Sequence, residues 1–244
     1  GFEADRAGFY FADIDEADFR RAAFDHAVFK HVTFDGGYFN EVEIGVGNFI
    51  SARIDRAHFN RGSIGEASFY DARFDSLASF EDTHLGWCNF QDAAVVTGNF
   101  DGATLEQTTF RGTTFGSVTF DGVDPAGALV LADATVEEDL VLKPATERPP
   151  GDAYVSLRRS ELASATLAQP ETGRAVYDLA DATLGDVQFR DAGDDAHLLD
   201  RIRFLRTRFD AFDFRDDDDL DLTTNEFVIH DLAVDADTLD ALVC

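Results

Sequence analysis

Residues 24–39, FDHAVFKHVTFDGGYF, place a large aromatic side chain at every fifth position, at Phe24, Phe29, Phe34 and Phe39. An α-helix returns to the same face every 3.6 residues and a β-strand every second residue, so a five-residue step matches neither element. On a helix the rings would scatter around the axis, and in a strand they would alternate between the two faces. The spacing therefore indicates an architecture built on a short repeat.

The five-residue step extends far beyond this stretch. It holds 14 consecutive large apolar positions from Phe9 to Phe74, slips by one residue in FDSLASF, and then holds nine more from Phe80 to Phe120. The residue two places before each of them is always small: Ala, Gly, Thr, Val or, once, Cys88. An unbroken pattern over 23 repeats predicts a periodic architecture.

We predict that this repeat builds a solenoid, in which each unit turns the chain by the same angle. If each pentapeptide forms one side of a square, four make a coil of about 20 residues with the large residue pointing to the axis. Equivalent rings would stack at the roughly 4.8 Å spacing of hydrogen-bonded strands, so the regular part would form a rod about 28 Å long. Phe24, Phe29, Phe34 and Phe39 would then be the four inner corners of one coil.

The repeat unit, as in residues 17–19 (ADF) and 22–24 (AAF), resembles that of the pentapeptide-repeat family. The resemblance covers residues 7–122 and implies an all-β solenoid, a right-handed quadrilateral β-helix. The family's frequent Asp or Asn beside the small residue is kept only in places, as at Asp13 and Asp18, and Phe rather than Leu dominates the centre. Residues 1–122 are therefore expected to form the regular β-helix.

Beyond residue 122 the five-residue step becomes irregular. Residues 123–151 combine VDPAGALVLADATVEEDLVL, which is typical of short strands, with KPATERPPG (143–151), which we predict to be a linker or protruding loop. The step returns in residues 152–215, which we expect to form further, less regular coils. Its large positions there are Leu179, Leu184, Phe189, Phe204, Phe209 and Phe214.

Residues 216–244 are predicted to form an acidic loop and a C-terminal cap, or the start of a missing segment. Asp216 to Asp219 are four consecutive acids and lack the alternating spacing of a calcium loop, so a solvated loop is favoured over a metal site. The stretch VDADTLDAL is typical of a short capping helix that begins at Asp235 or Asp237.

The net charge of −28 comes from an unusual choice of residues, because most acids are Asp and the only lysines are Lys30 and Lys143. One interpretation is a partner that expects negative charge, such as a protein that normally grips DNA. The other is a cytoplasm rich in salt, where the Debye length is about 3 Å at 1 M and like charges stop repelling. Because the excess runs along the whole chain, the pattern favours adaptation to salt.

The sequence does not predict an enzyme, a cofactor site or a metal site. Cys88 and Cys244 make no disulfide framework, no Cys or His pair has zinc spacing, and no nucleophile elbow or phosphate loop is present. His26 and His31 lie on outer positions of adjacent sides and would point apart. No apolar stretch is long enough to span a membrane, and no signal peptide is visible.

One side of the predicted rod differs from the others in charge. Over residues 8–122 its outer positions carry Lys30 and Arg111 against Asp71 and Asp92, whereas the other three sides are net acidic. An uncharged strip on an acidic rod is typical of a contact surface, and the alternative is that later segments fold back over it. Trp87, on another side, is either covered by such a segment or exposed. The possible partner-contact face consists of Tyr10, Phe11, Lys30, His31, Ile50 and Tyr70.

The stretch LLDRIRFLRTRFDAFDF (198–214) resembles a segment that follows the coils in haloarchaeal pentapeptide-repeat proteins, some of which continue into membrane-spanning helices. Because the chain begins at Gly1 and stops abruptly at Cys244, we expect a fragment or processed chain. The resemblance implies the N-terminal part of a longer, membrane-associated protein. Membrane association would come only through a missing C-terminal portion.

Two functions remain as hypotheses. The first is a non-catalytic, salt-adapted rod in the cytoplasm that presents a face to an unknown protein partner or spaces a membrane-linked domain. The second, implied by the resemblance, is mimicry of B-DNA to bind DNA gyrase or another DNA-binding protein, as in relatives that shield gyrase from fluoroquinolones. Direct nucleic-acid binding is not expected, and both a monomer and a homodimer stay open.

Overall fold

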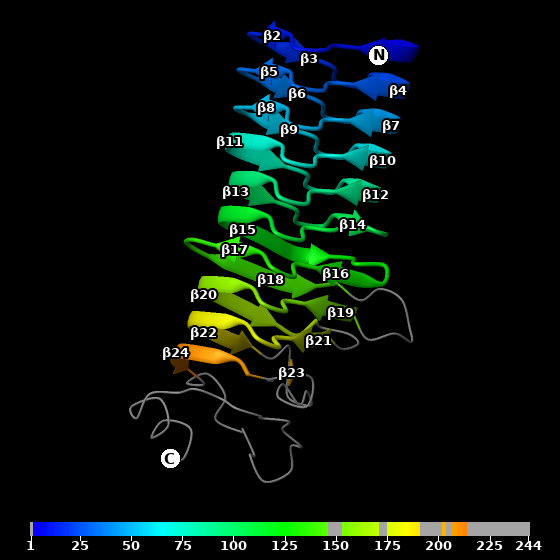
Figure 1. Cartoon of the computed structure of the whole chain (residues 1–244). Coiled ribbons are helices and arrows are strands. Elements are labelled where there is room, and N and C mark those ends of the chain that lie inside the picture. Colours follow the sequence, from blue (N-terminus) through cyan, green and yellow to red (C-terminus); the bar gives the residue numbers. More distant parts are fainter. Residues whose placement is uncertain (1, 146–152, 171–174, 191–201, 204–205, 214–244) are drawn as a thin grey trace.

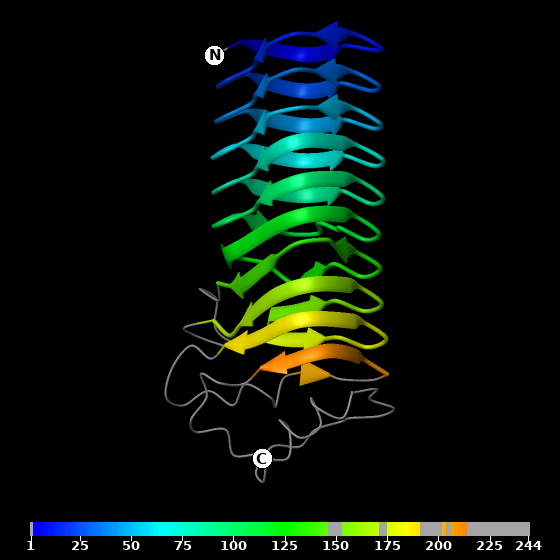
Figure 2. The ribbon, with the colours of Figure 1, turned by 90° about the vertical axis from the view of Figure 1, so that its left-hand side faces the viewer.

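The computed structural model describes residues 2–145, 153–170, 175–190, 202–203 and 206–213. In these residues the chain forms a parallel β-solenoid of about nine turns, which Figures 1 and 2 show as a stack of coils. The described residues contain no helix. The all-β solenoid predicted from the five-residue step is confirmed.

Several predictions concern residues outside the described part of the chain. They are the acidic loop and the capping helix within 216–244 and the repeat positions Phe204 and Phe214. The division of the chain into four segments also stays a prediction. The described coils stack without interruption across residue 122, because a single strand, β15, runs from Thr114 to Val123.

The strands form three sheets that run along the rod. One flank, on the right in Figure 1, is a six-stranded sheet of β1 (Glu3–Gly8), β4 (Ala23–Val28), β7 (Glu43–Asn48), β10 (Ser63–Ser68), β12 (His84–Asn89) and β14 (Thr104–Leu105). Four more strands follow on the same flank: β16 (Ala128–Val130), β19 (Ala153–Ser156), β21 (Ala175–Asp178) and β23 (Ile202–Arg203).

The other flank is a 14-stranded sheet. Its main path is β2 (Asp13–Ile14), β5 (Thr33–Phe34), β8 (Arg53–Ile54), β11 (Arg73–Ser79), β13 (Ala94–Asn99), β15, β17 (Thr135–Val136), β20 (Glu161–Ala168), β22 (Thr183–Arg190) and β24 (Arg208–Asp213). Beside this path lie β3 (Ala17–Asp18), β6 (Gly37–Tyr38), β9 (Ala57–His58) and β18 (Leu140–Pro144).

Each regular coil has four short pairing segments, one for each side. In the second coil these are residues 23–24, 26–28, 33–34 and 37–38, and each pairs in parallel with the segment 20 residues later. Phe24 therefore lies beside Ile44 and Phe34 beside Ile54. The coil length matches the four-sided unit predicted from the sequence.

The core is dominated by two ladders of phenylalanine rings. Within each ladder, rings from successive coils stack with centroids 4.5–5.3 Å apart. Between the ladders the rings meet edge to face, as Phe39 and Phe49 do at 80°. The first ladder contains Phe9, Phe29, Phe49, Phe69, Phe90 and Phe110, and the second Phe19, Phe39, Phe59, Phe80, Phe100 and Phe120.

The corners of the coil are of two alternating kinds. The residue two places after each ladder phenylalanine has a positive φ, and most of these corners are hydrogen-bonded turns. After Phe19, for example, the Ala22 N–H donates to the Phe19 carbonyl at 3.0 Å and Arg21 has a φ of 59°. A positive φ at the third residue defines a type II turn. The corners after the other central residues of the regular coils have no positive φ. The strand continues around the corner after Phe24 within β4, whereas β5 ends at Phe34 and β6 begins at Gly37. The backbone therefore repeats every ten residues, although the sequence repeats every five.

The one-residue slip in the sequence is a β-bulge in β11. Phe74 pairs with Ile54, 20 residues earlier, whereas Ala78 pairs with Ala57, 21 residues earlier. The extra residue lies at a corner, where Asp75 bonds both Arg53 and Arg73. Polar contacts at the surface therefore absorb the insertion, and the stacking of the core continues past it.

The irregular part of the sequence continues the same stack. Leu179, Leu184 and Phe189, the positions expected to point inward, are all buried. Lys143 and Pro144, assigned to a loop from the sequence, instead form the end of β18, where Pro144 lies beside Val123. Proline is tolerated there because it occupies the last place of the strand and need not donate to the ladder.

Candidate interaction surface

The candidate contact residues lie on the outside of one side of the rod. The inward residues of that side form the first phenylalanine ladder. Tyr10, Phe11 and Tyr70 are 59%, 76% and 41% exposed, which is unusual for large hydrophobic side chains. His31 is also exposed, while Lys30 and Ile50 are half-buried. The structure thus brings the six residues onto one side, in the first four coils.

Phe11 and His31 lie at the edge of this side, one coil apart. Their rings stack with centroids 4.8 Å apart and an angle of 19° between the planes. Both stand two residues after a ladder phenylalanine, with φ values of 52° and 55°. The left-handed backbone at these turns directs both rings away from the core.

The same edge carries very different residues in later coils. Gly112 occupies the equivalent turn position with a φ of 67°, where a residue without Cβ has no steric penalty. A non-glycine residue in this region costs about 1–2 kcal/mol. The turn itself therefore provides no reason for a phenylalanine at residue 11.

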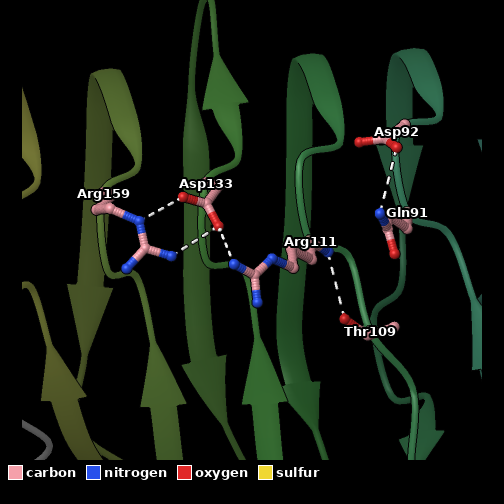
Figure 3. A network of polar contacts seen from close by, with 6 residues as sticks. All are labelled: Gln91, Asp92, Thr109, Arg111, Asp133 and Arg159. Carbon is pink, nitrogen blue, oxygen red and sulfur yellow. Dashed lines mark hydrogen bonds and ion pairs between the residues drawn. The ribbon is translucent and has the colours of Figure 1, made fainter.

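Part of the uncharged character of this side has a structural cause. The Asn48 side chain accepts a hydrogen bond from the Ile50 N–H at 3.1 Å, and Asn89 accepts one from the Gln91 N–H at 2.8 Å. Thr109 accepts from the Arg111 N–H at 3.3 Å, as Figure 3 shows. Short polar residues precede these turns because they bond their own backbone two residues on. The aromatic residues have no such role.

Further along the rod, the same edge becomes a ladder of ion pairs. Asp133 is bonded in a bidentate manner by Arg159, at 2.5 and 2.8 Å, and Arg111 lies 2.9 Å away on its other side (Figure 3). Asp181 and Arg206 repeat this bidentate pairing. Hydrogen bonds from Arg159 hold the pKa of the Asp133 carboxyl below its usual range, and Arg206 does the same for Asp181.

Four other exposed large hydrophobic residues lie on other sides of the rod, and a fifth, Phe2, precedes the first strand and is 61% exposed. Trp87 is 61% exposed, which decides between the two alternatives raised for it, and Val46 is 40% exposed. Leu77 and Val96 also face solvent. The prediction from the sequence compared only the charges of the sides and therefore missed Val46, Leu77 and Val96. Each of the three stands at an outer position of its repeat, and this position would have identified it.

The other side chains relevant to chemistry are the metal-ligating residue types and Cys88. No group of three His, Cys, Asp or Glu residues is placed there to hold a metal ion. Cys88 is buried, and burial raises the pKa of its thiol to about 12. Among the described residues, no helix has the length and apolar character needed to cross a membrane.

No protein-family model and no curated protein matches this sequence. Among solved structures, the chain is similar to QnrB1, a plasmid-mediated fluoroquinolone resistance protein, with 13% identity and a TM-score of 0.29 over 100% of this chain and 96% of that one. It is also similar to HetL, a pentapeptide repeat protein involved in heterocyst differentiation regulation in the cyanobacterium Nostoc, with 11% identity and a TM-score of 0.23 over 80% and 87% of the two chains. Likenesses this weak carry no argument about function.

Proposed function

We propose that this protein is a non-catalytic interaction module of the pentapeptide-repeat kind, a rigid rod that presents one side to a protein partner. The contact residues are Tyr10, Phe11, Lys30, His31, Ile50 and Tyr70. In a longer parent protein, the same rod would also space a membrane-linked domain from its partner.

The exposure of Phe11 is the observation that carries this proposal. Its ring is 76% exposed, so it gains little from burial, and its φ of 52° is unfavourable for any residue with a Cβ. Its stack on His31 is too small a gain to explain the choice, since an aromatic pair contributes about 0.5–1.5 kcal/mol. Folding therefore does not account for Phe11, whereas binding would, because exposed aromatic side chains are common anchors of interfaces.

The neighbours of Phe11 fit an interface as well. Tyr10 and Tyr70 add exposed aromatic area, and this side has no net charge over residues 8–122. Aromatic residues are enriched and charged residues depleted at the centre of protein interfaces. The acids of this side, Asp71 and Asp92, lie in later coils than Phe11. They accept hydrogen bonds from Ser51 and Gln91, respectively.

A comparison of three baits tests the proposal. The intact rod, a Tyr10→Ser/Phe11→Ser variant and a Val96→Ser control would be used to capture proteins from an extract of the source cells. Val96 is a matched control because it is an exposed hydrophobic residue on another side. We expect one protein to bind the intact rod and the control but not the double variant. After purification, that protein should again bind the intact rod and the control more tightly than the double variant. The same captured proteins from all three baits would contradict the proposal.

We further propose that the excess of acids is an adaptation to the salt-rich cytoplasm of a haloarchaeon. Several acids are paired with arginine at separate places along the rod, as in the row Arg21, Glu41 and Arg61. Such pairs weaken mimicry of B-DNA as an alternative, because they reduce the free negative charge of the sides that carry them. Asp75, bound by Arg53 and Arg73, is a second example.

A further inference from the structure

A second side of the rod combines free acids with an exposed tryptophan. This acidic side consists of the outward residues next to the central residues Phe24, Ile44, Ile64, Leu85, Leu105 and Pro125. Its charged residues are Asp25, Glu43, Glu66, Glu106 and Asp124. Up to position 127, Arg6 in the first coil, beside His26, is the only Lys or Arg residue in an outward position on it.

The five acids of this side have no arginine or lysine within ion-pair distance among the described residues, whereas several acids on the other sides do. On those sides, Asp18 pairs with Arg20 and Asp75 with two arginines. In the described coils of the acidic side, Glu106 lies 3.8 Å from the imidazole of His84. This contact is an ion pair only when the imidazole is protonated. The negative charge of this side is thus available to a partner.

Trp87 stands within this field of carboxylates. It lies in β12 directly beside Glu66 of β10, and Glu66 in turn lies beside Val46 of β7. Trp87 and Val46 are 61% and 40% exposed, so an apolar row with an acid at its centre faces solvent. Trp87 is also the only tryptophan of the chain.

The row beside it is formed by Gly45, Gly65 and Gly86. At Gly86 a Cβ would lie 2.2 Å from the Gly65 carbonyl oxygen, so the close approach of the coils excludes a side chain there. In these three coils no side chain therefore projects between the Trp87 row and the row of Glu43, Ser63 and His84. A partner chain can reach the indole face and the flanking carboxylates together.

We propose that the acidic side binds an extended basic segment of a partner protein, with an arginine or lysine of that segment over the Trp87 ring. A cation above an indole face gains about 0.5–2 kcal/mol, and the neighbouring Glu66 carboxylate adds a charge-assisted hydrogen bond. A purely apolar partner would have to bury the unpaired Glu66 carboxylate, which is costly. Nucleic acids and anionic lipids are repelled by the same charges.

This surface is separate from the side that carries Phe11, and neither assignment depends on the other. The two surfaces would let one rod hold two partners, or two segments of one partner. A variant that loses binding at the Phe11 side should still bind through the acidic side. A variant that loses binding at the acidic side should still bind through the Phe11 side.

Fluorescence of Trp87 provides a direct test, because no other tryptophan contributes. The probe is a peptide of alternating arginine and serine, titrated into the full chain with selective excitation of the indole. A labelled copy of the same peptide gives the affinity of variants by anisotropy. We expect a saturable change in Trp87 emission, and Trp87→Ala should weaken binding about tenfold, which corresponds to about 1.4 kcal/mol.

Charge-matched variants separate this site from general attraction to an acidic protein. Glu66→Gln/Glu106→Gln and Glu16→Gln/Glu137→Gln remove the same charge, but the second pair lies on a different, exposed side. We expect the first pair to weaken binding at least about tenfold and the second less than about twofold. Equal weakening by both pairs, or binding without a change in Trp87 emission, would overturn the proposal. Circular dichroism of each variant at the same salt concentration would establish that it remains folded.

Discussion

Phe69 and Phe74 are five residues apart and both fully buried, yet their surroundings differ. Phe69 belongs to a ladder and stacks on Phe49 and Phe90, with centroids 4.7 and 4.5 Å away. Phe74 has no stacked ring, and its neighbours in the adjacent coils are Ile54 and Val95. The central positions are therefore of two kinds, although their chemical class is the same.

Substituting isoleucine at these two positions should have unequal costs. Phe74→Ile introduces the residue type that the adjacent coil has at the equivalent position, Ile54. We therefore expect the free energy of unfolding to fall by less than about 1.5 kcal/mol. Phe69→Ile removes two ring stacks, each contributing about 0.5–1.5 kcal/mol beyond its buried area, and should cost at least about 1 kcal/mol more. Urea denaturation at constant KCl measures both. Equal losses would show that ring stacking does not distinguish the two positions.

Phe11→Gly separates the stability of the fold from binding. Glycine relieves a left-handed backbone penalty of about 1–2 kcal/mol, while loss of the stack on His31 offsets about 0.5–1.5 kcal/mol of that gain. The free energy of unfolding should therefore stay within about 1 kcal/mol of the wild type, while capture of the partner is lost. The same urea titration and the capture assay provide the two readings. A large loss of stability would make Phe11 a structural residue instead.

The ion-pair ladder of Asp133, Arg159, Asp181 and Arg206 links the turns of successive coils. Hydrogen bonds from the arginines lower the pKa of both carboxyls. A lowered pKa stabilises the fold above the unfolded-state pKa of about 3.9, and that stability is lost as the pH falls through the lower folded-state value. These turns should therefore contribute least in acid.

Asp133→Asn tests the acid dependence of this ladder. The variant should be less stable than the wild type near neutral pH. The difference should begin to shrink below the unfolded-state pKa of about 3.9 and close only when the pH has fallen through the lower folded-state pKa of Asp133. Thermal melts followed by circular dichroism across this pH range measure the difference. Arg159→Gln, which keeps the carboxylate but removes its partner, should show the same convergence. A constant difference at all pH values would contradict the assignment of the ion pair.

At the level of the elements, the sequence predicted the sides of the coil but not its two kinds of corner. The alternation was nevertheless present in the sequence, because every second central residue is Phe without exception, whereas the others include Ile14, Val95 and Leu105. The backbone of the turn could not be inferred, because Arg21, Glu41 and Arg61 occupy left-handed positions where glycine would have been the expected signal.

At the level of the whole molecule, the five-residue step alone sorted the outward residues by side, since every coil repeats the same four directions. It therefore placed Tyr10, Phe11 and Tyr70 together without any structure. It could not decide whether Trp87 is exposed, because that depends on how residues far along the chain pack against the rod. Lys143 and Pro144 were misassigned for a related reason, since their proline-rich surroundings concealed the end of a strand.

The net charge of −28 predicts that the rod needs salt to fold. The Debye length falls from about 10 Å at 0.1 M to about 3 Å at 1 M salt, so repulsion along the rod should fade as KCl rises. We expect the far-ultraviolet β signal and a single mass by light scattering to develop between about 0.2 M and about 3 M KCl. KCl could stabilise the rod in two ways, by screening its charges or by being excluded from its surface. An uncharged osmolyte is excluded from the surface but screens no charge, so it serves as the control that separates the two effects.

The two outcomes have different consequences for function. Folding that requires KCl and is not restored by the osmolyte would mean that most carboxylates serve solubility in salt, so that binding depends on the few local features of Phe11 and Trp87. A rod that is folded and dimeric at low salt would contradict the salt adaptation. Its charge would then be available to a partner, and inhibition of DNA gyrase would be the next assay. The strength of the repulsion between carboxylates decides between these cases, because this repulsion opposes the folded rod at low ionic strength. The rod can fold at low salt only if arginine pairs, such as Arg159 with Asp133, already neutralise enough of the negative charge.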